Sequence, residues 1–142
     1  MAGMTAPRPF SNALDRLRRV GLRPTRQRLA LARLLFEKGH RHVTAEQLHG
    51  EALESAVRVS LATVYNTLHQ FTAAGLLAEV VVEAGRWYFD TNVEDHHHFF
   101  FEDTGSLQDI PGDSVVVKDV PTPPDGTAIR RVDVIIRVGA KA

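Results

Sequence analysis

The sequence of 142 residues contains no cysteine. Disulfide bonds, thiolate zinc sites and cysteine nucleophiles are therefore excluded, and any metal ion must be bound by nitrogen and oxygen atoms. Long apolar runs are also missing, and the N-terminal segment lacks the apolar stretch of a signal peptide. We therefore expect a cytoplasmic protein that does not enter the membrane. The sequence has no Gly-rich phosphate loop, HExxH helix or nucleophile constellation, which argues against most enzyme classes.

Positive and negative charges balance over the whole chain but separate along it. Residues 1–76 carry 11 Lys and Arg against 5 Asp and Glu, whereas residues 77–142 carry 6 against 12. Basic surfaces attract phosphates and acidic clusters attract cations. The sequence therefore indicates a nucleic-acid partner for the first half and a cation for the second.

Helical periodicity dominates the first half of the chain. Ser11, Thr25 and Ser60 are suited to cap the starts of helices, and Thr44 with Gln47 forms a capping box. These signals predict four helices. The apolar face of the fourth helix should lie in the core. It consists of Leu61, Val64, Leu68 and Phe71.

A β-hairpin is predicted directly after these helices. Residues 77–82 and 87–90 have the pattern of strands, and residues 83–86 form the turn between them. Helices followed by a hairpin are typical of a winged helix-turn-helix, whose last helix enters the major groove of DNA. The polar face of that helix and the basic residue before it carry candidate DNA contacts, although a solvated helix face would look similar: Arg58, Thr63, Tyr65, Asn66, His69 and Gln70.

The remaining sequence is β-like and short. Residues 131–138 alternate between apolar and polar side chains, which predicts a strand. A sheet this small seldom buries enough surface alone, so we expect it to pair with a second copy in a homodimer. The predicted fold class is α+β. It comprises an N-terminal winged helix-turn-helix DNA-binding domain at residues 1–90 and a small C-terminal α/β dimerisation domain at residues 91–142.

Three consecutive histidines lie between carboxylates in the second half, at residues 95–103. On a strand, His96 and His98 point to one side and His97 to the other. Imidazole and carboxylate bind Zn, Mn and Fe(II), and imidazole is also an axial ligand of haem iron. A metalloenzyme with an open coordination position is the alternative from a different functional class. A polar loop with unused histidines is the plainest alternative.

Several motifs resemble the ferric uptake regulator superfamily over about residues 14–110. They are residues 21–28 (GLRPTRQR), 42–46 (HVTAE), 62–65 (ATVY) and 70–71 (QF). The resemblance implies a dimeric, metal-responsive repressor that binds double-stranded promoter DNA. It also implies that Tyr65 contacts bases from the recognition helix. Arg23 would reach into an A·T-rich minor groove, which suits a guanidinium group.

The same resemblance implies a regulatory metal site with ligands from both domains. Its histidine from the third helix corresponds to His42, and an acidic residue that ends the wing corresponds to Asp90, as in the peroxide-sensing branch. The complete implied set is His42, Asp90, His96, His98 and Asp109. The expected ion is Mn, Fe or Zn.

The chain departs from the superfamily pattern after the histidines. Most members have Cys-x-x-Cys there, whereas this chain has Phe101 and Thr104, so the structural zinc site is absent. This departure and the run of three histidines resemble the iron response regulator branch, which senses haem. We therefore expect haem to bind in the region of His96, His97 and His98 and to oppose DNA binding. A direct sensor of divalent metal or of peroxide remains the alternative.

Overall fold

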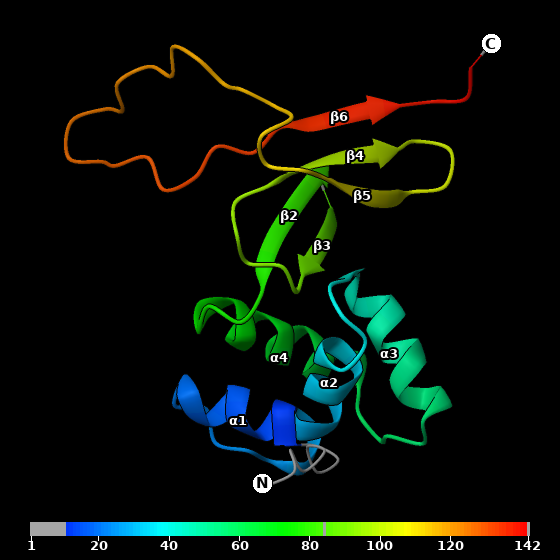
Figure 1. The fold of residues 1–142 in the computed structure, drawn as a ribbon. Coiled ribbons are helices and arrows are strands. Elements are labelled where there is room, and N and C mark those ends of the chain that lie inside the picture. The colour runs from blue at the N-terminus through cyan, green and yellow to red at the C-terminus, as the bar shows by residue number, and fades with distance from the viewer. Residues whose placement is uncertain (1–10, 84, 142) are drawn as a thin grey trace, which may run out of the picture. The chain divides into compact units, whose positions relative to one another are not determined.

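The structure is a computed structural model that describes residues 11–83 and 85–141 (Figure 1). The chain divides into two compact units, Met1–Val93 and Glu94–Ala142. Among the described residues, no helix has the length and apolar character needed to cross a membrane. Each unit has a sheet of its own, and the helices belong to the first unit.

Within its described residues, the first unit contains four helices, as predicted. They are α1 (Ser11–Arg19), α2 (Arg26–Phe36), α3 (Ala45–Glu54) and α4 (Leu61–Ala73). Thr25, Thr44 and Ser60 cap the last three through their side chains, and the predicted capping box of Thr44 and Gln47 is present. Ser11 is the first described residue of α1, and its predicted capping role lies outside what the structure describes.

The helices of the first unit pack around one apolar core. Val64, Leu68 and Phe71 of α4 are fully buried, and the rings of Phe71 and Phe36 lie 6.3 Å apart. Leu61 was predicted to belong to the same stripe, but 36% of it is exposed. It is the first residue of α4 after the cap Ser60 and therefore lies at the end of the helix.

A three-stranded antiparallel sheet completes the first unit. Its strands are β1 (His42–Val43), β2 (Ala78–Glu83) and β3 (Arg86–Asp90), in the order β1-β3-β2. Strands β2 and β3 form the predicted hairpin, with Gly85 in the left-handed region at its turn. Strand β1 has only two residues and was not predicted. It pairs His42 with Asp90, so it determines the geometry of a candidate site.

The second unit is built on a sheet with the strand order β5-β4-β6. Strands β4 (His97–Phe101) and β5 (Ser106–Ile110) form an antiparallel hairpin, and β6 (Ile135–Val138) pairs with β4 in parallel. A strand was predicted over residues 131–138, but only the last four of these residues form one. Residues 94–141 form strands and irregular segments but no helix, so the C-terminal domain that was predicted to be α/β contains only strands among its described residues.

Apolar side chains remain exposed on the second unit. They are Val116, Val117, Val120, Ile129, Val132 and Ile136, with exposed fractions between 37% and 70%. A concentration of exposed aliphatic residues on a small sheet and its adjoining segment is typical of a surface that another chain covers.

Candidate metal centre and nucleic-acid interface

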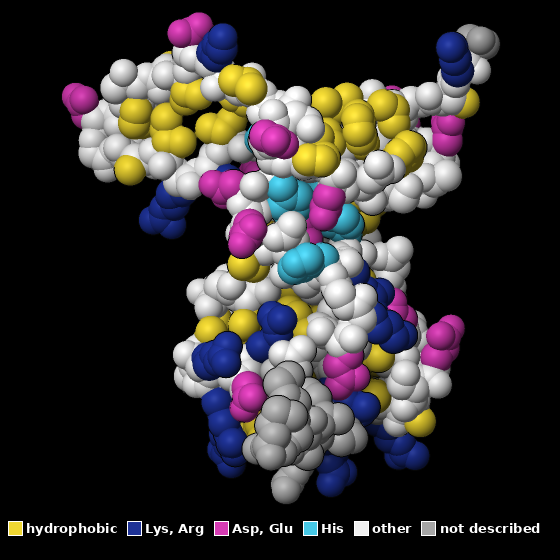
Figure 2. All heavy atoms as spheres, in the orientation of Figure 1, with side chains coloured by type: hydrophobic (Ala, Val, Ile, Leu, Met, Phe, Trp, Pro, Cys, Tyr) yellow, Lys and Arg dark blue, Asp and Glu magenta, His cyan; other side chains and the backbone are white. Residues whose placement is uncertain are grey.

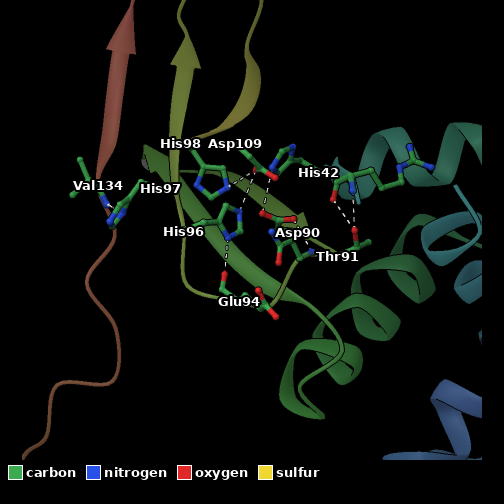
Figure 3. Close-up of polar contacts among 11 residues, drawn as sticks. His42, Asp90, Thr91, Glu94, His96, His97, His98, Asp109 and Val134 are labelled. Atoms are coloured by element: carbon green, nitrogen blue, oxygen red, sulfur yellow. Dashed lines mark hydrogen bonds and ion pairs between the residues drawn. The ribbon is translucent and has the colours of Figure 1, made fainter. Parts of the chain in front are cut away.

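The first unit holds a histidine and a carboxylate in contact. His42 of β1 lies opposite Asp90 at the end of β3, and its Nε2 atom is 3.3 Å from Oδ2 of Asp90 (Figure 3). The other carboxylate oxygen of Asp90 accepts the N–H of Asn92 at 2.9 Å. Although the superfamily resemblance implied a histidine within the third helix, His42 precedes that helix because Thr44 caps its start.

The backbone next to this pair is fixed by Thr91. The hydroxyl of Thr91 accepts the N–H of Arg41 at 2.8 Å, and the N–H of Thr91 is bonded to the carbonyl of Arg41 at 3.0 Å. The guanidinium of Arg41 in turn forms two hydrogen bonds with the carboxylate of Glu51, at 2.9 and 2.5 Å. These contacts hold β1 in register beside β3. Thr91 and Arg41 were not identified from the sequence.

The second unit holds two histidines around one carboxylate. Nε2 of His96 lies 3.2 Å and Nε2 of His98 lies 3.4 Å from the same oxygen of Asp109 (Figure 3). One ligand atom from each of the three residues lies within 4.8 Å of the others. Nδ1 of His96 is 2.6 Å from the carbonyl oxygen of Glu94. A carbonyl can only accept, so Nδ1 carries a proton, and in the neutral ring Nε2 presents its lone pair.

His97 points away from this group, as the strand alternation predicted. Its Nδ1 accepts the backbone N–H of Val134 at 3.0 Å, which ties β4 to the segment leading into β6. In the neutral ring the proton is therefore on Nε2. His97 thus has a structural contact, whereas His96 and His98 lie with Asp109 in a group that could hold a metal ion.

The residues proposed from the sequence to contact DNA all belong to the first unit. Arg23 is exposed in the α1–α2 connection, Arg58 is exposed before α4, and Asn66 is exposed on α4. Thr63 takes part in the cap, because its N–H is bonded to the Ser60 hydroxyl at 3.1 Å. Figure 2 shows Lys and Arg side chains distributed over the helical unit, in agreement with the charge separation along the sequence.

Tyr65 of α4 is bonded to a carboxylate at the start of α3. Its hydroxyl donates to Oε1 of Glu46 at 2.6 Å, a length typical of a charge-assisted hydrogen bond. This hydrogen bond, with smaller contributions from desolvation and the Glu46 charge, raises the pKa of Tyr65. On the same helix, the exposed ring of His69 makes edge contacts with Trp87 and Phe89 of β3, at 5.9 and 5.6 Å between ring centres. Glu46 was not identified from the sequence.

A helical unit with a β-hairpin and a second unit with a His/Asp cluster together match known proteins. Residues 19–122 match the ferric uptake regulator family model. The chain belongs to this family. It is 34% identical over 100 residues to a ferric uptake regulation protein of Shigella flexneri, covering 70% of this chain and 68% of that one. It is 33% identical over 100 residues to the peroxide-responsive repressor of Staphylococcus aureus strain Mu50, covering 70% and 67%.

A solved structure supports the same assignment. The ferric uptake regulator of Pseudomonas aeruginosa, determined with manganese, superimposes with a TM-score of 0.70 and 26% identity over 92% of this chain and 98% of that one. The chain is therefore an α+β protein with a winged-helix DNA-binding domain and a dimerisation domain, as the resemblance implied. As a member of the ferric uptake regulator family, this chain is a metal-responsive transcription regulator and not an enzyme. The metalloenzyme alternative is therefore discarded.

Proposed function

We propose that this protein is a divalent-metal-responsive repressor that binds promoter DNA as a homodimer in the cytoplasm. The arrangement of His96 and His98 around Asp109, with the His96 tautomer fixed by a carbonyl, is the observation that carries the proposal. Two imidazole nitrogens lie close to the same carboxylate oxygen. This arrangement suits a small cation, which could be coordinated by both nitrogens and by the carboxylate.

One ion takes all five ligands in this proposal. The His42–Asp90 pair alone offers two ligands, and the group around Asp109 offers three. Mn and Fe(II) commonly take more ligands than either set provides, and a mixed set of imidazoles and carboxylates without thiolate suits them as well as zinc. The P. aeruginosa regulator was determined with manganese, which supports a divalent ion as the bound group.

The mechanism follows from where the ligands lie in the sequence. His42 and Asp90 belong to the sheet of the first unit, which contains the β2–β3 hairpin. The other three proposed ligands, His96, His98 and Asp109, belong to the second unit. An ion bound by both sets restrains the DNA-binding domain at residues 1–90 relative to the dimerisation domain at residues 91–142. In a dimer, this restraint sets the spacing of the two α4 helices and thereby favours a DNA site with matching half-site spacing.

Contacts with DNA are assigned to α4 and its basic surroundings. We propose that Thr63, Tyr65 and Asn66 face the major groove, that Arg58 contacts phosphate, and that Arg23 enters the minor groove. The excess of Lys and Arg in residues 1–76 supplies the attraction to the DNA backbone that does not depend on sequence.

Haem sensing by the iron response regulator branch remains a prediction for this chain. The described residues do not fit iron ligation by His97, because its Nδ1 already accepts the Val134 N–H and its Nε2 then carries the proton. His96 and His98 face a carboxylate at contact distance, an environment suited to a small ion rather than to the flat face of a porphyrin. We therefore favour the divalent ion as the signal.

The test compares metal-dependent DNA binding of the wild type and a matched pair of variants. Fluorescence anisotropy with a labelled A·T-rich promoter duplex is measured after chelation and after addition of Mn, Fe(II) or Zn. We expect the ion to strengthen specific binding in the wild type and in the control His40→Ala, which removes an exposed histidine. His96→Ala should lose this response. Equal DNA affinity with and without every ion would refute the proposal.

A further inference from the structure

A carboxylate is an unexpected group beside a helix that approaches DNA. Glu46 is exposed in the first turn of α3, where the helix dipole favours a negative charge. The capping box of Thr44 and Gln47 holds this turn in place. Because phosphates repel carboxylates, Glu46 opposes DNA binding unless its charge serves a specific contact.

That contact is with the hydroxyl of Tyr65, and it alters what Tyr65 offers to DNA. A tyrosine has one O–H proton to donate and lone pairs that accept. The 2.6 Å hydrogen bond to Glu46 uses the only proton. The remaining capacity of the Tyr65 oxygen is to accept, and the Glu46 carboxylate likewise only accepts.

Both side chains line the same hollow on the first unit. It has a volume of about 360 Å³ and is lined by Thr44, Glu46, Tyr65, Gly85, Arg86 and Trp87. The side chains of Glu46 and Tyr65 are therefore surrounded by residues from the first turns of α3 and α4 and from the turn between β2 and β3. A group entering the hollow meets carboxylate and phenol oxygens whose hydrogen-bond roles are already set.

We infer that Glu46 makes Tyr65 an acceptor-only contact that selects the amino groups of adenine or cytosine. In the major groove, adenine N6 and cytosine N4 donate, whereas guanine O6 and N7 and thymine O4 accept. A tyrosine free to rotate its hydroxyl would serve both kinds of edge. Glu46 removes that choice and is a specificity-determining residue. This inference rests on the proposed position of α4 in the major groove.

A purely structural role for Glu46 gives a different experimental result. If the bond only ties α3 to α4, then removing Glu46 changes the melting temperature or the affinity for all duplexes together. If the bond fixes the donor and acceptor pattern, then removing Glu46 changes the preference between bases. The test must therefore compare duplexes that differ by one amino group.

The experiment uses a duplex that the protein binds specifically. Each adenine in turn is replaced with purine, which lacks the N6 amino group. Each cytosine in turn is replaced with an analogue that lacks the N4 amino group. Affinity is measured by anisotropy with the metal-loaded protein. At one position or more, the wild type should lose about 3- to 10-fold on removal of the amino group. Tyr65→Phe should lose this penalty, because it has no oxygen to accept.

The decisive variant is Glu46→Ala, which frees the hydroxyl of Tyr65 to donate. We expect the penalty at the same position to shrink and binding of guanine or thymine there to improve. Glu46→Gln should retain part of the wild-type preference, because its amide oxygen can accept the Tyr65 proton while its amide NH2 group can instead donate to the Tyr65 oxygen. Glu54→Ala, which removes an exposed carboxylate from the same helix, is the control for charge and should strengthen binding to all duplexes without changing base preference.

Two negative results can be told apart. Unchanged base preference in Glu46→Ala, with specific and metal-dependent binding intact, overturns this inference alone. Absence of specific metal-dependent binding in the wild type overturns the proposed function as well.

Discussion

His98 lies directly opposite Asp109 in the β4–β5 hairpin, with Nε2 of the histidine 3.4 Å from Oδ1 of the carboxylate. This pairing depends on the hairpin register. A slip of one residue would place Gln108 or Ile110 opposite His98 and would turn the carboxylate to the other face of the sheet. The Thr104–Gly105 turn that closes the hairpin, with Gly105 in the left-handed region, therefore contributes to the candidate metal centre from a distance.

The first prediction follows from the shared oxygen of Asp109. Asp109→Ala removes the atom that both His96 and His98 approach, so metal affinity should fall by about 100-fold or more, beyond the 10- to 100-fold typical of losing an outer partner of a ligand. Competition with a calibrated chelator measures this change. Asp113→Ala, an exposed carboxylate of the same unit, should bind metal like the wild type. A wild-type affinity in Asp109→Ala would exclude Asp109 as a ligand.

The sequence predicted those parts of the fold that have local causes. Caps at Thr25, Thr44 and Ser60 fixed three helix starts correctly because a cap acts within four residues. Strand β1 was missed because two residues have no periodicity, and its existence depends on pairing with β3, more than 40 residues away. The length of β6 was overestimated because alternation does not tell which residues find a partner.

The residues of the candidate sites also fall into those that the sequence predicts and those that it does not. Histidines and carboxylates are recognisable from their chemistry, whereas the groups that orient them are not. Glu46 contacts Tyr65 across 19 residues, and Thr91 contacts Arg41 across 50. Neither Glu46 nor Thr91 carries a local signal, because a carboxylate near a helix start and a threonine after a strand are both common. Only the tertiary structure identifies them.

The second prediction concerns Thr91 as a positioning residue for His42. Thr91→Val removes the hydroxyl that accepts the Arg41 N–H, and the loss of this part-buried hydrogen bond costs about 0.5–1.5 kcal/mol of folding stability. We expect metal affinity to fall by about 10-fold, since β1 then loses part of its alignment with β3. Thr91→Ser keeps the hydroxyl and should restore both properties. Chemical denaturation and chelator competition measure the two effects, and a loss of stability without any loss of metal affinity would contradict the positioning role.

The third prediction concerns the ionisation of Tyr65. Its pKa is raised chiefly by the hydrogen bond to Glu46, so the folded state favours the neutral phenol. The contribution to stability is therefore complete below the ordinary tyrosine pKa of about 10 and is lost as the pH rises through the higher folded value. Ultraviolet absorbance, compared between the wild type and Tyr65→Phe, should show Tyr65 titrating above the free amino acid. Glu46→Ala should return that tyrosine toward pH 10, whereas Glu54→Ala should not.

The last prediction separates a structural histidine from ligating ones. His97→Ala removes the acceptor of the Val134 N–H and should destabilise the pairing of β6 with β4, by about 0.5–1.5 kcal/mol for one lost hydrogen bond. Its affinity for a divalent ion should stay within a few-fold of the wild type, because the ring points away from Asp109. His96→Ala should behave in the opposite way, with a lost ion and little change in β6. Visible spectra with added haem complete the comparison: a haem band that disappears in His97→Ala alone would show that iron displaces the Val134 contact, and would favour haem over the divalent ion as the signal.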